Sequence, residues 1–563
     1  MSAAASTDST NSHRALEPGT NTPVVCGASV AASPEATNCK PDLEPRAYAR
    51  TMRRILVVLV GVGVAIRIVR LVIPSPIWGD EAMLALNFID RDYAGLTRCL
   101  SNAQVAPILF LWCERFVLIN VGTADWAMRL IPFLTSVGGV FLFWDFARRT
   151  VSPTAATLAV GIMAVSVWPV SMAATVKPYS GDLFWSAMLL ALAARWYQRP
   201  ERLWPLVGLV VAIPFALGSS YPVVFVAGAV SLYLLPVAWR ARRPAQALFV
   251  SYNLAMLAAF VVTYLVVGRA QIDPDSGTTG SFMRWYWRNG FFPESVWQWP
   301  LWFLQANTGR MFAYPLGDSN GGSTATTLLF LMGVWLCWRN ESRSLLIVCL
   351  VPFALNLVAA ALGKYPYGGC CRLSQHLAPA VCLLAGVGWA YVLEWYAPRR
   401  ADRLGLVRLA AGFLIVFGTV ELVHRCVKVD HDQISRFGAH LHNELNEELQ
   451  PGDRIVVRDM AASDATTQWY LKRFGDRVID LHPEESLPSA ERLWVISTAA
   501  NKSPLGSHQK FVEAAKGWQP VETFSFTVRP NLADGQDVWW YTAMTCLVRP
   551  GDTRPPPRLN VVP

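Results

Sequence analysis

A series of long apolar stretches constrains the fold of this chain more than any other feature. A membrane-spanning helix needs ~20 mainly apolar residues, and eleven stretches approach or reach that length. They are 55–73, 130–147, 155–174, 183–194, 203–217, 222–238, 245–267, 324–337, 344–362, 377–393 and 406–423. Only 16% of the residues are charged, whereas soluble domains carry about 25%. The chain is therefore predicted to be a mainly α-helical, polytopic membrane bundle.

The distribution of arginine predicts the orientation of this bundle. The loops that would lie inside carry arginine pairs or triplets, such as Arg148 and Arg149, whereas the short outer loops carry only Lys177, Lys364 and Arg372. Because positive charge is retained in the cytoplasm, the N-terminus is predicted to be cytoplasmic. The net charge of +9 is thus a topology signal, and no nucleic-acid partner is expected.

One apolar segment, 105–121, must stay outside the bilayer for this pattern to hold. Glu114 and Arg115 lie at its centre, and charges there are expensive in lipid. We interpret it as an interfacial or re-entrant helix on the outer face. A second long outer loop, about 268–322, is rich in tryptophan, tyrosine and phenylalanine. It is predicted to lie on the membrane surface as a lid or guide for a carrier lipid.

Three domains are predicted. Residues 1–45 are rich in Ser, Thr, Ala, Asn and Pro, a composition typical of a disordered tail. Residues 46–425 form the transmembrane domain. In residues 426–563 the hydropathy falls, and strand-like segments (453–459, 492–497, 524–528, 538–542) alternate with helix-like ones (465–474, 508–516). This is a soluble α/β domain, which eleven spans would place outside the cytoplasm.

Two adjacent carboxylates, Asp80 and Glu81, follow the first apolar stretch. Charges at a membrane edge are functional candidates when they face a polar cavity, and a carboxylate beside a hydroxyl can accept its proton. Consecutive helical residues point ~100° apart, so one of the two is expected to face a reaction centre. The alternative is that they cap the helix that follows them.

Two further motifs open on the same side of the membrane. Lys177-Pro-Tyr179-Ser-Gly-Asp182 offers a cation, a phenol and an acid. Lys177 is a candidate to hold a phosphate, and Asp182 to bind a divalent ion or the acceptor; alternatively, Asp182 caps the next helix. Arg372 follows a Tyr365-Pro-Tyr motif. Its guanidinium suits bidentate phosphate contact, although an interfacial arginine can also simply reach toward the headgroups.

Taken in order, these motifs resemble the GT-C class of integral-membrane glycosyltransferases, specifically the glycosyltransferase family 39-like proteins. That group includes protein O-mannosyltransferases, the lipid A aminoarabinose transferase and rhizobial lipopolysaccharide core transferases. The resemblance covers roughly residues 50–425. It rests on Trp78-Gly-Asp80-Glu81-Ala, Gln104-Val-Ala-Pro107-Ile-Leu-Phe-Leu, Met128-Arg129-Leu-Ile-Pro132, Lys177-Pro-Tyr-Ser-Gly-Asp182, and Tyr365-Pro-Tyr through Arg372.

The resemblance implies inverting transfer of a sugar from a polyprenyl-phosphate carrier to an extracytoplasmic lipid, glycan or protein, in a bacterial cytoplasmic (inner) membrane. It implies roles for eight residues. The catalytic acids are Asp80, the expected base, and Glu81; the donor-phosphate contacts are Arg372, Lys177 and Arg129; the acceptor or metal contacts are Asp182, Tyr179 and Gln104.

One departure from the family pattern leaves acceptor handling and a divalent metal open. Many members have His-Pro-Pro or Lys-Pro-Pro where this chain has Gln104-Val-Ala-Pro107. Two other functions stay in view: a transporter or flippase of a lipid-linked sugar, and a non-catalytic membrane protein that binds glycans. No P-loop is present in the sequence, so ATP-driven transport is not supported.

Overall fold

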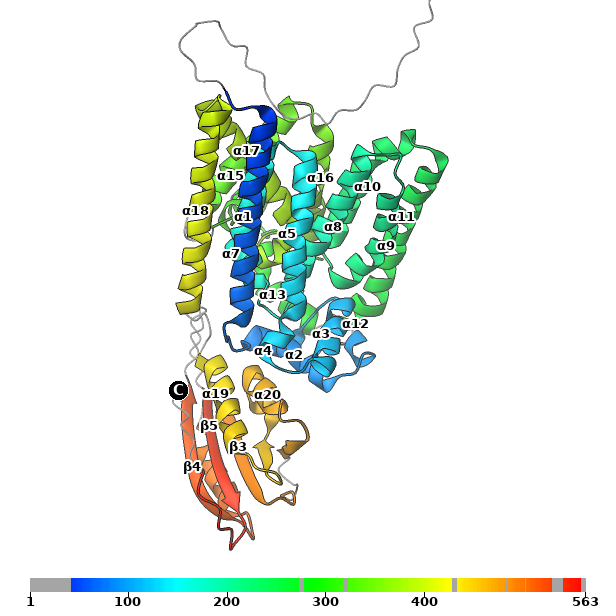
Figure 1. Cartoon of the computed structure of the whole chain (residues 1–563). Coiled ribbons are helices and arrows are strands. Elements are labelled where there is room, and N and C mark those ends of the chain that lie inside the picture. The colour runs from blue at the N-terminus through cyan, green and yellow to red at the C-terminus, as the bar shows by residue number, and fades with distance from the viewer. Residues whose placement is uncertain are drawn as a thin grey trace, which may run out of the picture.

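The computed structural model describes residues 42–272, 278–316, 322–427, 433–481, 485, 487–501, 503–528 and 540–557. A bundle of roughly parallel helices forms one part, and a small unit of strands and helices lies below one end of it (Figure 1). The predicted tail, residues 1–45, lies almost wholly outside the described residues. Pro45, at its end, is already the first residue of a helix.

Each of the eleven predicted stretches coincides with helix. The helices are α1 (Pro45–Val72), α5 (Leu130–Thr150), α6 (Pro153–Val165) with α7 (Val167–Met172), α8 (Tyr179–Gln198), α9 (Trp204–Ser219), α10 (Val223–Arg240), α11 (Arg243–Val262), α15 (Gly322–Arg339), α16 (Arg343–Ala361), α17 (Ala378–Tyr396) and α18 (Arg400–Val427). Within the described residues, 7 helical segments are long and apolar enough to cross a membrane. They are α1, α5, α10, α16, α18, α11 extended to Gln271, and α17 extended back to Cys371.

The remaining four predicted stretches, which correspond to α6 with α7, α8, α9 and α15, are not both long and apolar enough to meet that criterion. α6 and α9 are apolar but shorter. The predicted stretch 155–174 is broken at Ser166, which has an extended backbone conformation between α6 and α7. α6 lies inside the bundle, because all but its first residue are buried. A short inner helix of this kind is surrounded by protein rather than lipid, so it need not match the bilayer thickness.

Glycines allow the inner helices to approach closely. A Cβ on Gly333 of α15 would lie 2.0 Å from the carbonyl oxygen of Leu384, and one on Gly388 of α17 would lie 2.0 Å from that of Leu329. No side chain fits at either position. Small residues that bring helix backbones together are the usual packing device of membrane bundles.

A layer of short helices covers the lower end of the bundle (Figure 1). It contains α2 (Gly79–Asp90), α3 (Ile108–Asn120) and α4 (Asp125–Met128), all between α1 and α5. α3 has 13 residues, or about 20 Å at 1.5 Å per residue, which is too short to span a bilayer. The charged pair at its centre avoids lipid: Glu114 is buried, and Arg115 donates to the carbonyl of Phe88 at 2.6 Å.

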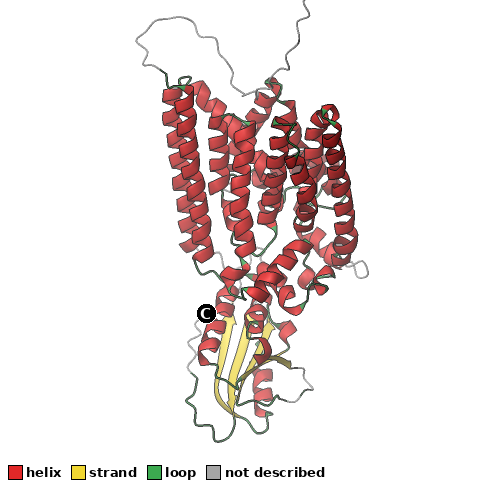
Figure 2. Ribbon diagram, turned by 45° about the vertical axis from the view of Figure 1, so that its right-hand side comes forward, coloured by secondary structure: helices red, strands yellow, loops and turns green. Residues whose placement is uncertain are grey.

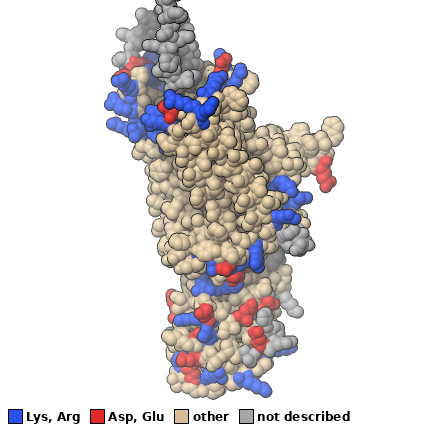
Figure 3. Space-filling view, turned by 90° about the vertical axis from the view of Figure 1, so that its right-hand side faces the viewer, with Lys and Arg blue, Asp and Glu red and all other residues tan. Residues whose placement is uncertain are grey.

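The aromatic outer loop also contains short helices, α13 (Thr278–Tyr286) and α14 (Trp299–Gln305). Many of its apolar side chains are exposed, and Trp297 is 94% exposed. Exposed aromatics of this density fit the headgroup level of a bilayer. The space-filling view shows Lys and Arg gathered at the upper end of the molecule, above a broad uncharged band (Figure 3). The chain is an integral membrane protein, as its apolar stretches predicted.

The C-terminal unit is a five-stranded mixed sheet with helices (Figure 2). The sheet order is β2-β1-β3-β5-β4, with β1 parallel to β2 and β3, and β5 antiparallel to β3 and β4. The elements are α19 (Gln433–Glu448), β1 (Arg454–Arg458), α20 (Ala465–Lys472), β2 (Val478–Leu481), β3 (Arg492–Ala500), α21 (Leu505–Glu513), β4 (Gln519–Val528) and β5 (Trp540–Val548). Every strand and helix expected here from the sequence is present, and α19 and β2 are additional.

Alternating residues divide the sheet between two cores. Ile455 and Ile496 pack in a cluster with α19, whereas Val456 and Val495 pack in a cluster with α21. This is the two-residue period of a strand that is covered on both faces.

Candidate functional site

Three predicted residues from distant parts of the chain meet at the lower end of the bundle. Asp80 lies in the first turn of α2. Its Oδ1 is 3.0 Å from the Nζ of Lys177, and its Oδ2 is 3.2 Å from the Nη1 of Arg372. Each carboxylate oxygen therefore faces its own cation. We call Asp80, Lys177 and Arg372 the charge cluster.

Two other predicted residues, Gln104 and Tyr179, contact the two cations of this cluster. Lys177 lies between α7 and α8, and its Nζ also donates to the Oε1 of Gln104 at 2.7 Å. Arg372 lies in the 3₁₀ helix η8 (Cys371–Leu377), directly before α17. Its guanidinium carbon is 5.9 Å from the ring centroid of Tyr179 and 4.9 Å from that of Trp287. Both distances lie within the range of a cation–π interaction.

The electrostatics of the cluster favour an anion. Burial opposes ionisation of Asp80, but the charges of Lys177 and Arg372 outweigh it and hold the pKa of Asp80 below its usual value. Burial lowers the pKa of Lys177, and the charge of Asp80 opposes that change. With Asp80 ionised, one positive charge is left over among three side chains that are at least 74% shielded from solvent. A second anion, such as a phosphate, would be attracted to this point.

Glu81 has a different environment from its neighbour. Its Oε2 is 3.1 Å from the Nη2 of Arg129, and both side chains are almost fully buried. The same oxygen accepts from the amide of Trp78 at 3.3 Å, and Oε1 accepts from the amide of Val176 at 2.6 Å. The capping alternative therefore applies to Glu81, which closes the start of α2. The catalytic role expected of Glu81 stays a prediction.

Arg129 completes this second assembly. Its guanidinium donates to the carbonyls of Ser75 at 2.6 Å and Pro76 at 3.2 Å. Glu81 and Arg129 thus bind three backbone groups just before Asp80, and they also bind the amide of Val176, the residue before Lys177. The buried pair positions two members of the charge cluster. Direct phosphate contact by Arg129 is still untested.

Asp182 lies apart from the charge cluster. It is buried in the first turn of α8, where its Oδ1 accepts from the hydroxyl of Ser220 at 2.6 Å. Of the eight predicted site residues, Asp80, Lys177, Arg372, Gln104 and Tyr179 form one connected group, Glu81 and Arg129 form a pair, and Asp182 bonds to Ser220.

Sequence reasoning missed Trp287 as a site residue. The richness in aromatics predicted that its loop lies on the membrane surface as a lid or guide for a carrier lipid, with no role for this tryptophan beside Arg372. The structure places its ring over the guanidinium of Arg372, a contact between residues that are 85 positions apart in the chain. No spacing rule links such positions, so only the tertiary structure could reveal it.

The residues of this site do not provide a good set of divalent-metal ligands. Both oxygens of Asp80 face cations, and Asp182 has a hydroxyl rather than another acid as its partner. Within the described residues, no group of three or more His, Cys, Asp or Glu side chains is arranged to hold a metal. We therefore derive no step through a metal.

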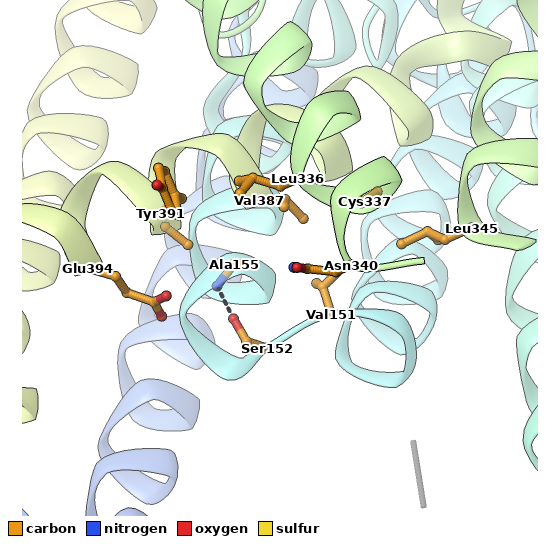
Figure 4. Close-up of a pocket in the computed structure, with 11 residues that line it drawn as sticks. Val151, Ser152, Ala155, Leu336, Cys337, Asn340, Leu345, Val387, Tyr391 and Glu394 are labelled. Carbon is orange, nitrogen blue, oxygen red and sulfur yellow. Dashed lines mark hydrogen bonds between the residues drawn. The ribbon is translucent and has the colours of Figure 1, made fainter. Parts of the chain in front are cut away.

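The pocket in Figure 4 lies at the other end of the bundle. Its lining includes Ser152, which caps α6 by accepting from the amide of Ala155 at 3.3 Å, and Glu394 near the end of α17. The length of α17 separates Glu394 from Arg372, a distance of roughly 30 Å along the helix. This pocket is not part of the charge cluster.

Comparisons with known proteins agree with the resemblance drawn from the motifs. Residues 105–267 match the family model described as dolichyl-phosphate-mannose-protein mannosyltransferase. No curated protein matches the chain by sequence.

A solved structure extends the similarity over most of the chain. The apo crystal structure of ArnT from Cupriavidus metallidurans has a TM-score of 0.50 and 15% identity, over 86% of this chain and 97% of that one. The structure of ArnT bound to undecaprenyl phosphate has a TM-score of 0.49 and 14% identity, with the same coverage of both chains. An Archaeoglobus fulgidus oligosaccharyltransferase tethered to an acceptor peptide has a TM-score of 0.42 and 12% identity, over 77% of this chain and 64% of that one. The fold of the chain is thus similar to that of ArnT, a GT-C fold, and its residues 105–267 resemble a family of mannosyltransferases.

Proposed function

We propose that this chain transfers a sugar from a polyprenyl-phosphate carrier to a hydroxyl of an extracytoplasmic lipid, glycan or protein, with inversion at the anomeric carbon. The observation that carries the proposal is the placement of Asp80 between Lys177 and Arg372. A base and two phosphate-binding cations at one point are what such a transfer requires. The family matched by residues 105–267 is named for a sugar donor of this kind, dolichyl-phosphate mannose.

The donor phosphate would bind to the two cations. Arg372 can offer two parallel N–H groups to phosphate oxygens, while Lys177 supplies a compact charge that Gln104 orients through its side-chain oxygen. Trp287 and Tyr179 hold the guanidinium from its faces. As the phosphate takes over these cations, Asp80 loses the partners that depress its pKa, and it becomes a stronger base.

The transfer then follows from the geometry. Asp80 accepts the proton of the acceptor hydroxyl while that oxygen bonds to the anomeric carbon. The bond between the anomeric carbon and the phosphate oxygen breaks, and the carrier leaves as polyprenyl phosphate. Lys177 and Arg372 stabilise the negative charge that develops on the leaving oxygen. Attack from the face opposite the leaving phosphate inverts the configuration.

The charge cluster is proposed to lie on the extracytoplasmic side. The arginine-rich loops, such as the one containing Arg148 and Arg149, lie at the opposite ends of the helices from α2. Retention of positive charge in the cytoplasm supports this orientation. The soluble domain, which contacts α2, would then lie outside as well.

Reconstitution with defined donors tests the function. The purified protein would be incorporated into vesicles with polyprenyl-phosphate sugars and a mixture of lipid, glycan and peptide acceptors, and glycosylated products would be identified by mass. Asp80→Asn is expected to lower the rate by at least roughly 10²-fold, since loss of a general base has effects of this size. The donor should still bind.

The matched control is Asp92→Asn. Asp92 lies in the same outer loop and accepts from the amide of Gly95 through its side-chain oxygen, a bond that asparagine can also make, so this variant should keep full activity. Translocation of the lipid-linked sugar with no glycosidic bond formed would identify a flippase instead. Glycan binding by the protein that is unaffected by Asp80→Asn, with no transfer, would identify a binding protein.

A further inference from the structure

The short helix α20 belongs to two hydrophobic cores at once. Leu471 packs in the core between the sheet and α19. Its neighbours Trp469 and Tyr470 pack instead in the cluster of the outer loop, with Ile77, Phe88 and other residues on and around α2. Trp469 and Tyr470 are almost fully buried. The soluble domain is therefore continuous in packing with the helix that presents Asp80.

Hydrogen bonds and an ion pair also join α20 to the outer loop. The hydroxyl of Tyr470 accepts from the amide of Ile77 at 3.0 Å and donates to the Oδ2 of Asp125 at 2.8 Å. The Oδ1 of Asp125 is 3.0 Å from the Nη1 of Arg473. Ile77 is three positions before Asp80. A side chain of the soluble domain thus binds the backbone directly at the entry to α2.

The far end of α2 is also bound. The Nζ of Lys472 lies 2.6 Å and 2.7 Å from the two oxygens of Asp90, the last residue of α2. Both side chains are partly exposed, so this ion pair by itself contributes little stability. The ion pair instead helps to orient α2, because α20 then binds the chain at both ends of this 12-residue helix.

We propose that the soluble domain is a positioning element of the active site: docking of α20 sets the place of α2, and Tyr470 is the positioning residue that transmits this to Asp80. The inference rests on the proposed function. α2 does not cross the bilayer, so its place is fixed by packing and by bonds to its neighbours, among which are those from α20. A shift of about 1 Å in a catalytic group can lower the rate by up to 10²-fold, and Tyr470 binds the chain next to that group.

The first test compares Tyr470→Phe with Tyr541→Phe. The control residue lies on β5, where it pairs with Ala499 and Thr527. Tyr470→Phe keeps the buried ring and removes only the hydroxyl. Amide hydrogen exchange in the segment 74–84 should become roughly fivefold faster, the effect of losing one hydrogen bond. The maximal rate of transfer should fall roughly tenfold with the donor KM unchanged. Tyr541→Phe should change neither quantity.

A charge exchange provides the second test. Lys472→Glu places like charges together and should lower the maximal rate, and the combination of Lys472→Glu with Asp90→Lys should restore it. Unchanged exchange in segment 74–84 with full activity in Tyr470→Phe would overturn the inference, as would a failure of the charge exchange to restore the rate. Hydrogen exchange needs no substrate. If wild-type protein transfers no sugar while Tyr470→Phe still loosens segment 74–84, the proposed function fails and the docking stands.

Discussion

Adjacent carboxylates in this chain have separate tasks because their surroundings differ. Asp80 faces Lys177 and Arg372 at a partly open point, whereas Glu81 is buried against Arg129 and closes the start of α2. The sequence predicted that only one of the two would face a reaction centre, because they point apart on a helix. In the structure, Asp80 is the one of the two that faces the cations of the charge cluster.

The ionisation of Asp80 yields a prediction for stability against pH. Its pKa in the folded protein is depressed below 3.8, so its contribution to stability is fully present above that value and is lost as pH falls through the folded pKa. Asp80→Asn should therefore unfold at a lower temperature than wild type at pH 6. Thermal unfolding in detergent should show this difference shrinking below about pH 4. A difference that widens in acid would contradict the assignment.

At the scale of elements, glycine decides how the central helices pack. Gly333 and Gly388 let α15 and α17 meet backbone to backbone, and α17 begins directly after the 3₁₀ helix that carries Arg372. The position of Arg372 therefore depends on a helix contact deep in the bundle. The sequence contains both glycines, but their partners, Leu384 and Leu329, follow from no local pattern.

Gly388→Ala tests this contact. The added methyl group would meet the Leu329 carbonyl at 2.0 Å, so the helices must move apart. We expect destabilisation of about 1–3 kcal/mol or more, the size of an overpacked core, measured as a lower unfolding temperature. Gly412→Ala on α18 is the matched control, because a Cβ there meets nothing within 4 Å; alanine should be neutral or slightly stabilising there.

On the scale of the whole molecule, the fold separates two kinds of environment. The bundle is uncharged over a broad band (Figure 3). The charge cluster, the short outer helices and the soluble domain are grouped at one end (Figure 1). In the proposed function, this arrangement would bring a lipid-borne phosphate and a water-borne acceptor to the same point.

The proposed orientation can be measured with reporter fusions. Alkaline phosphatase fused after Pro563 should be active in cells, because this enzyme needs disulfides that form only outside a bacterial cytoplasm. Green fluorescent protein fused before Met1 should fluoresce, because the N-terminus is expected on the cytoplasmic side. Inactive phosphatase at the C-terminus would reverse the topology and place the charge cluster in the cytoplasm.

The sequence by itself determined the membrane character, the helices of the bundle and the α/β nature of the C-terminal unit, and it singled out the three residues that meet in the charge cluster. Those features depend on local composition, periodicity and short motifs, which can be read without knowing what lies nearby in space. It also predicted that the motifs containing Asp80 and Arg372 open on the same side of the membrane, and the Oδ2 of Asp80 lies 3.2 Å from the Nη1 of Arg372.

Tertiary structure alone decided which partners these residues have. The stacking of Trp287 on Arg372, the closure of α2 by Glu81 and Arg129, and the docking of Tyr470 beside Ile77 join segments from 48 to 393 positions apart. Contacts at such separations depend on how the helices pack against one another. A single sequence leaves no local signal for that packing, so the arrangement of the charge cluster and its link to the soluble domain emerge only in the folded chain.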